Sequence, residues 1–200
     1  MKCKGQSMLE TLIVLPLFLL MLAAAVQGLW ILLAQQMLQA ASLHVVRQAS
    51  LTGGDSLAML QVLESRMRPL PGSRLHIPDI KRLHPSDRLI REQGDRVVSE
   101  GRVFYQLSSD FAGARLASLH ETEREAWLRA RIFKVGITWC QSLLVPMMAQ
   151  TLQPFLRSST SPAQQYCNLQ SSGREPMLAI QVTAATQMIA PLEIAGAITD

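Results

Sequence analysis

The stretch GQSMLETLIVLPLFLLMLAAAVQGLWILL, residues Gly5 to Leu33, decides how the rest of the chain is organised. Its single carboxylate is Glu10, and no charged residue occurs from Thr11 to Ala34. Gln27 is the only strongly polar side chain in that run. A helix of about 20 apolar residues is long enough to cross the hydrocarbon core of a bilayer. The stretch therefore predicts one membrane-spanning helix.

The basic residues around this helix predict its orientation. Lys2 and Lys4 precede it, and the first basic residue after it is Arg47. Because short cytoplasmic segments carry the excess of lysine and arginine, we expect a cytoplasmic N-terminus, with the bulk of the chain across the membrane.

Gly5 and Glu10 indicate a more specific class of protein than a plain membrane anchor. A carboxylate at the end of a membrane helix is costly and usually marks function, unless it lies at headgroup depth. Gly5 follows two lysines, Glu10 comes five residues later, and the apolar run begins directly after Glu10. This arrangement resembles the prepilin signal of type IV pilin-like proteins. The resemblance implies that a prepilin peptidase cuts after Gly5 and that Gln6 becomes the methylated N-terminus. It also implies that the N-terminal amine of a neighbouring subunit neutralises Glu10, since a buried charge is tolerated when it is paired.

Two segments point to a particular group within these pilin-like proteins. They are the run from Glu10 through Pro16 and the segment QQMLQAAS at residues 35–42, which is rich in glutamine and small residues. The chain resembles the TadE-like minor pseudopilins of the tight adherence (Flp, type IVb pilus) system over about the first 50 residues. Thr11 stands where the major Flp pilins have tyrosine, which favours a minor subunit, as does the length of 200 residues. The resemblance implies that Glu10 and Pro16 act in assembly.

The same resemblance implies partners and a location. The partners are the prepilin peptidase, other pilin and pseudopilin subunits, the inner-membrane assembly platform and the lipid bilayer. The location is the bacterial inner membrane, with one span, a cytoplasmic N-terminus and a periplasmic C-terminal domain. Two alternatives stay open, namely that the subunit enters the pilus or remains in the membrane.

The chain as a whole predicts an α+β fold in three parts. Residues 1–5 form the leader, residues 6–50 a membrane and stalk helix, and residues 54–200 a globular exported domain with a short antiparallel sheet. Helical spacing of apolar residues continues to Ser50, and Gly53-Gly54 ends the helix.

The exported part is expected to contain helices and a few strands. A short helix runs from Asp55 or Ser56 to Arg66, and a helix capped by Ser108 or Ser109 covers the sheet. Strands begin near Val135 and Ile180, where alternating apolar residues are followed by threonine and later proline. The remaining expectations are a loop-rich stretch at 73–101 with a helical turn after Ser86, a strand or helix start at 102–107, the covering helix at 110–131, and a mobile polar segment at 157–173.

The three cysteines agree with export. Cys3 would leave with the leader, so that Cys140 and Cys167 remain as an even pair in an oxidising compartment. This favours a disulfide over two separate free thiols. No second pair of ligands stands at zinc-like spacing, so we expect no metal site.

Composition and motifs argue against catalysis and nucleic-acid binding. The sequence has no Gly-rich phosphate loop, no His-Glu-x-x-His and no Gly-x-Ser-x-Gly, and its four histidines are isolated. We therefore expect no enzyme activity and no cofactor. The net charge of +4 is spread over scattered arginines among carboxylates, with few aromatics, which does not indicate a nucleic-acid surface.

Three other interpretations of the N-terminus stay open. A type II secretion pseudopilin would carry the same cleavage signal. An ordinary signal peptide cut after Ala25 would release a periplasmic binding module, although the apolar run continues to Ala34. A plain signal anchor would keep the whole chain.

Overall fold

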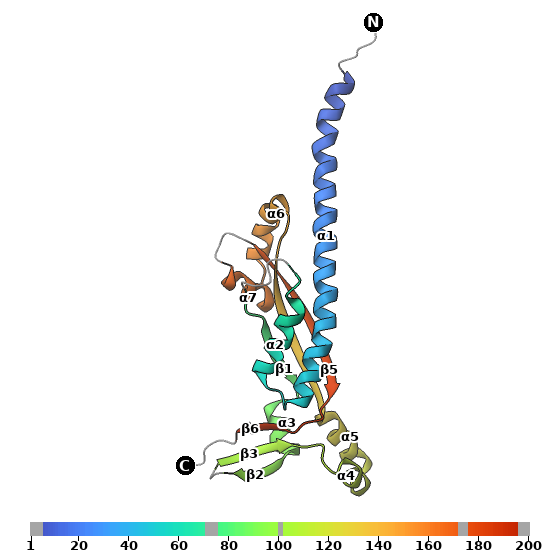
Figure 1. Ribbon diagram of the computed structural model, residues 1–200, viewed down its shortest axis with the longest axis vertical. Coiled ribbons are helices and arrows are strands. Elements are labelled where there is room, and N and C mark those ends of the chain that lie inside the picture. Colours follow the sequence, from blue (N-terminus) through green and yellow to red (C-terminus); the bar gives the residue numbers. More distant parts are fainter. Residues whose placement is uncertain (1–5, 71–75, 100–101, 172–175, 196–200) are drawn as a thin grey trace. The chain divides into compact units, whose positions relative to one another are not determined.

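The computed structural model describes residues 6–70, 76–99, 102–171 and 176–195, and it describes no side chains at 6–10, 99 and 195. The predicted class is confirmed, because a long apolar helix is followed by a mixed region of helices and small antiparallel sheets (Figure 1). In chain order the elements are α1 (Gln6–Leu51), α2 (Ser56–Met67), β1 (Asp79–His84), α3 (Asp87–Gln93), β2 (Asp95–Ser99), β3 (Arg102–Leu107), α4 (Ala112–Ser118), α5 (Glu121–Ala130), β4 (Ile132–Ser142), α6 (Pro146–Arg157), α7 (Pro162–Gln170), β5 (Met177–Gln187) and β6 (Leu192–Ala195).

Helix α1 ends where the sequence predicts. Gly53 and Gly54 have φ values of +63° and +81°, which residues with a Cβ rarely adopt. The N–H of Gly54 donates to the carbonyl of Ala49 at 2.8 Å, the 6→1 hydrogen bond of a Schellman motif. Beyond this turn Asp55 caps α2, since its carboxylate accepts a hydrogen bond from the N–H of Leu57 at 3.0 Å.

Contacts divide the chain into two compact units. One unit consists of residues 1–36 and 140–180, and the other of residues 37–139 and 181–200. Helix α1 and strands β4 and β5 contribute to both. The three-part division into residues 1–5, 6–50 and 54–200 stays a prediction.

The strands form two three-stranded sheets, in the orders β1-β4-β5 and β2-β3-β6. In the first sheet β1 is antiparallel to β4, with Ile80 opposite Ile137. In the second, β3 is antiparallel to both neighbours, and Tyr105 lies opposite Ile194. Helix α3 contacts β3 and α5 contacts α3. The segment 102–107, which the sequence left as a strand or a helix start, is thus a strand.

Burial on β4 follows the predicted alternation up to Ile137, and residues 137–141 are then all buried. Val135, Ile137 and Trp139 are at most 2% exposed. On β5, Ile180 is buried, whereas Leu178 and Val182 are half-buried. The two predicted strands are therefore present, and β4 contributes more to the core.

The prediction of a loop-rich stretch at 73–101 was wrong in its described part. Strands β1 and β2 lie there. The predicted helical turn after Ser86 is present as helix α3, and Ser86 Oγ caps it by accepting a hydrogen bond from the N–H of Leu89. The sequences DIKRLH and DRVVS are polar and form edge strands, in which pairing to β4 and β3 satisfies the N–H and C=O groups that face the partner strand.

The prediction of one helix at 110–131 was also wrong, because α4 and α5 are separate. Leu119 and His120 are extended between them, and His120 begins α5, with its N–H donating to Glu123 at 3.4 Å. The helix at 112 is not capped by either predicted serine, since the residue before it is Phe111, at φ +56°. Ser109 Oγ donates instead to the carbonyl of Met188 at 3.2 Å.

Replacing Gly53 should destabilise the turn after α1. A Cβ there would lie 2.6 Å from the carbonyl oxygen of Pro191, at a left-handed φ. We expect Gly53→Ala to lower the free energy of unfolding by at least about 1–2 kcal/mol, measured in detergent solution.

Gly113→Ala is the matched control, because Gly113 lies inside α4 with nothing within 4 Å of the added methyl group. Alanine is favoured over glycine in a helix, so this variant should be as stable as wild type or up to about 1 kcal/mol more stable. Equal stability of the two variants would contradict the assignment of strain to Gly53.

Candidate functional site

The first half of α1 presents apolar side chains all round. Every residue from Thr11 to Leu22 is exposed, so no single face of this stretch is covered. Over Thr11–Leu51 the helix is long and apolar enough to cross a membrane. Its large exposed hydrophobic residues up to position 33 are Leu12, Ile13, Val14, Leu15, Leu17, Phe18, Leu19, Leu20, Met21, Leu22, Val26, Leu29, Leu32 and Leu33. A helix that is apolar on all sides needs a nonpolar environment, which is a bilayer or other helices.

The second half of α1 has a different surface. From Ala34 onward buried residues recur every three or four positions and form one stripe. The buried members are Ala34, Leu38, Ala41, Ser42, Val45, Val46, Ala49 and Ser50. The predicted helical extension of the apolar segment is therefore confirmed, and one of its faces packs within the folded part of the chain.

Gln27 connects α1 to α6. Its side chain is 3% exposed, and its Oε1 accepts a hydrogen bond of 2.9 Å from the backbone N–H of Val145, the residue that precedes α6. This N–H is one of the donors that a helix N-terminus leaves without an intrahelical partner. Sequence reasoning noticed Gln27 as the one strongly polar residue of the run but gave it no role.

The predicted processing and assembly residues fall largely at the start of the chain. Gly5 lies outside the described residues. Gln6 and Glu10 are described only as backbone within α1. Pro16 is exposed inside α1, which continues through it. Because proline has no N–H, the carbonyl of Leu12 lacks its usual partner four residues on.

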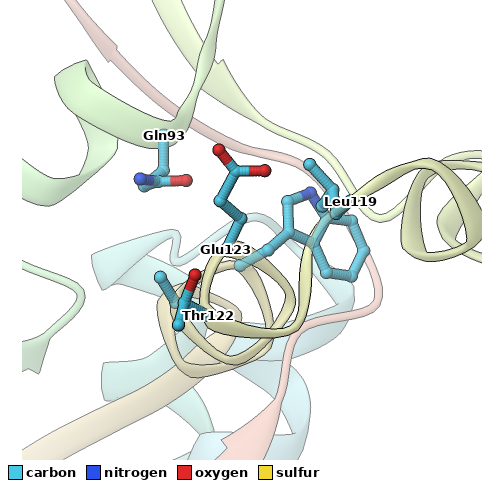
Figure 2. Close-up of a pocket in the computed structure, with 6 residues that line it drawn as sticks. Gln93, Leu119, Thr122 and Glu123 are labelled. Carbon is cyan, nitrogen blue, oxygen red and sulfur yellow. The ribbon is translucent and has the colours of Figure 1, made fainter.

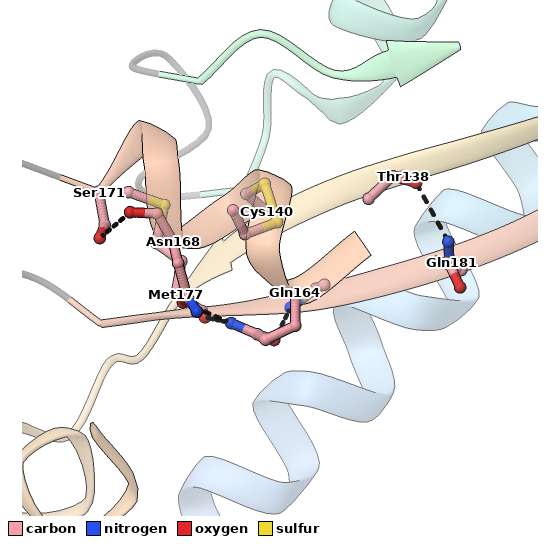
Figure 3. The surroundings of a disulfide bond; sticks show 9 residues. Thr138, Cys140, Gln164, Asn168, Ser171, Met177 and Gln181 are labelled. Carbon is pink, nitrogen blue, oxygen red and sulfur yellow. Dashed lines mark hydrogen bonds between the residues drawn. A yellow bond between two sulfur atoms is a disulfide. The ribbon is translucent and has the colours of Figure 1, made fainter. Parts of the chain in front are cut away.

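Cys140 and Cys167, the pair singled out by the sequence, are joined by a disulfide with a Cα–Cα distance of 5.4 Å (Figure 3). The bond ties the end of β4 to α7, and both cysteines are at most 2% exposed. Met177 at the start of β5 packs with them in one apolar cluster.

Two amide side chains hold α7 in the same unit, so the prediction of a mobile segment at 157–173 was wrong for its described part. Gln164 donates to the carbonyl of Met177 at 2.7 Å and accepts from the N–H of Ala179 at 3.0 Å, which extends the backbone pairing of β5 (Figure 3). Asn168 donates to the carbonyl of Leu156 at 2.9 Å and so joins α7 to α6.

Arg131 is a buried cation that sequence reasoning missed. It is 1% exposed, and its guanidinium donates to the carbonyls of Ser108 and Trp127 and lies over the Trp127 ring, 3.2 Å from its centroid. Burial, with a smaller contribution from the nearby Arg115, lowers the pKa of Arg131 to about 10, and Asp95 opposes the shift. The side chain therefore stays charged at neutral pH and serves as a polar clamp on these carbonyls.

A shallow cavity of about 340 Å³ lies between α3 and α5 (Figure 2). Its lining residues are Gln93, Leu119, Thr122, Glu123, Ala126 and Trp127. Its polar side chains are those of Gln93, Thr122 and Glu123. Within the ranges that the structure describes, no three His, Cys, Asp or Glu side chains are grouped to hold a metal ion.

A family model described as TadE-like protein matches residues 5–47. The N-terminal region of the chain is therefore TadE-like, which confirms the resemblance drawn from its sequence. This family is associated with the biogenesis of Tad pili. It is a pilin-type family whose members are generally not enzymes. Comparisons with curated proteins and with solved structures gave no match.

Removing the disulfide should loosen the unit that contains α7. The bond joins residues 27 positions apart, and in the chain-entropy model closing such a loop stabilises the fold by about 3–4 kcal/mol. We expect the double variant Cys140→Ser, Cys167→Ser to lose about this much, measured by denaturant unfolding in detergent.

Wild type treated with reductant is the control, and it should lose a similar amount. An unfolding midpoint that neither the substitution nor reduction changes would show that the disulfide does not stabilise this unit.

Proposed function

We propose that this chain is a minor pseudopilin that primes or joins the assembly of a Flp-type, tight adherence pilus. The observation that carries the proposal is the helix exposed on all sides from Thr11 to Leu22, within a region that matches the TadE-like family. In this proposal a prepilin peptidase cuts between Gly5 and Gln6, and α1 holds the subunit in the inner membrane as a single span.

Assembly follows from what the surface of α1 requires. The large apolar side chains of its first half cannot be left in water, because each exposed leucine costs about 1.5–3 kcal/mol relative to burial. In the bilayer, lipid tails cover them. When the subunit leaves the bilayer, the helices of other pilin and pseudopilin subunits must take the place of the lipid. The same surface thus serves for storage and for assembly.

Glu10 is proposed to fix the register of this packing. A carboxylate among apolar helices is tolerated only when its charge is paired or removed. The positively charged amine of a processed Gln6 on a neighbouring subunit would supply the partner. Only one axial placement of two neighbouring helices brings that amine to Glu10, so the pair would select one register.

Pro16 is proposed to contribute local adaptability. The carbonyl of Leu12 is released from the usual helical hydrogen bond, and membrane helices tolerate such a site when neighbours or small local adjustments satisfy the group. A bend at this position would let subunits adjust between membrane and filament.

The proposed location follows from the sequence around α1. Lys2 and Lys4 favour a cytoplasmic N-terminus, which puts the part after α1 in the periplasm. The Cys140–Cys167 disulfide supports this side of the membrane, since disulfides persist in oxidising compartments. Beyond the peptidase, its partners would be the other pilus subunits and the assembly platform in the inner membrane.

Glu10→Ala tests the proposal. We expect the variant to insert in the membrane to the wild-type level, because the apolar run is unchanged, but to reduce piliation and surface adherence about tenfold or more through loss of a buried charge pair. Pili would be counted by electron microscopy, and membrane insertion measured by fractionation.

Thr11→Ala is the neighbouring control and should leave piliation unchanged. If Glu10→Ala cells were piliated and adherent to the wild-type level, the register role of Glu10 would be wrong.

A further inference from the structure

Helix α6 exposes an apolar face. Its turns place Leu152 and Phe155 on one side and the polar Gln150, Gln153 and Arg157 on the other, whereas Met147, three residues before Gln150, lies beside the polar side. The apolar residues that are exposed on and just before α6 are Leu144, Met147, Leu152 and Phe155, and Phe155 is 73% exposed. Three large apolar side chains in water on one short helix, with a fourth just before it, are unusual for a soluble surface, and such a patch marks a contact with a partner or a membrane.

The hydrogen bond from Val145 to Gln27 fixes where α6 starts along α1. The donor is the residue before α6 and the acceptor lies on the apolar helix, in the same compact unit (Figure 1). The first turn of α6 must therefore lie at the same height along α1 as Gln27.

That height can be compared with the thickness of a bilayer. Gln27 is 17 residues after Glu10, which corresponds to about 26 Å at 1.5 Å per residue. The hydrocarbon core is about 30 Å thick, so a span that begins at Glu10 ends close to Trp30. Tryptophan prefers the membrane–water interface, which agrees with an outer boundary at this position. Gln27 then lies about one helical turn inside that boundary.

We propose that α6 is an interfacial helix whose apolar face enters the outer surface of the same bilayer that α1 spans. Leu152 and Phe155 lie at the boundary between headgroups and acyl chains, and Gln150 and Arg157 face the headgroups and water. Amphipathic helices bind membranes in this way, with the apolar face buried by about 5–10 Å. The Gln27 side chain caps the start of α6 at a depth where water is scarce. This inference rests on the proposed membrane span of α1.

Spin labels on the full-length chain test the proposal. Cys3→Ser removes the one cysteine outside the disulfide, and single cysteines are introduced by Leu152→Cys, Phe155→Cys, Gln150→Cys or Leu19→Cys. Each labelled chain is reconstituted, at fewer than one chain per vesicle, in phosphatidylethanolamine and phosphatidylglycerol at a ratio of 3:1. Collision rates with oxygen, which enters the bilayer, and with a water-soluble nickel chelate are measured by electron paramagnetic resonance.

We expect the labels at 152 and 155 to resemble the one at 19, in the middle of the span, with frequent oxygen collisions and about fivefold fewer nickel collisions than the label at 150. The label at 150 is the matched control on the polar face of the same helix.

Three other outcomes would overturn the proposal. Labels at 152 and 155 that resemble the label at 150, while the label at 19 is shielded from nickel, would place α6 in water and leave the membrane anchor intact. Low collision rates with both reagents would mean that protein covers the face. A label at 19 that is open to nickel would refute the membrane span, and with it the proposed function.

Discussion

The exposed apolar surface at the start of α1 must be kept out of water, and the rest of the structure depends on this constraint. Over Thr11 to Leu22 the folded chain covers no face of the helix, so its environment has to come from outside the molecule. A bilayer and a bundle of neighbouring helices both meet the requirement. A subunit that passes from one to the other needs no new surface, which is the physical basis of the pilin-type role.

Polar groups mark the places where α1 is fixed to the rest of the chain. In one unit the amide of Gln27 accepts from Val145. In the other, the carbonyl of Ser50 accepts from the N–H groups of Ile189 and Ala190 at 3.2 and 2.7 Å. Between them, the stripe that begins at Ala34 supplies apolar packing. The helix is therefore held by directional bonds at two levels.

The sequence was sufficient for the features that local patterns encode. The apolar run and the glycine pair predicted α1, alternating residues around Ile137 predicted β4, and cysteine parity pointed to Cys140 and Cys167. It was insufficient where distant parts decide the structure. Strands β1 and β2 are polar and form by pairing with β4 and β3. Helix α7 is held by the disulfide, which cysteine parity predicted, and by the bonds of Gln164 to β5, which neither composition nor spacing predicted. Burial of Arg131 depends on Ser108, 23 residues away.

The most direct test of the central claim is the N-terminal sequence and intact mass of the protein purified from cell envelopes. If α1 is the membrane and assembly helix of a processed pseudopilin, the chain begins with a methylated Gln6. A chain that begins at Met1 would contradict prepilin processing and reduce α1 to a plain anchor. A chain that begins at Val26 would contradict the account as a whole, because most of the exposed apolar surface would have been removed with a signal peptide.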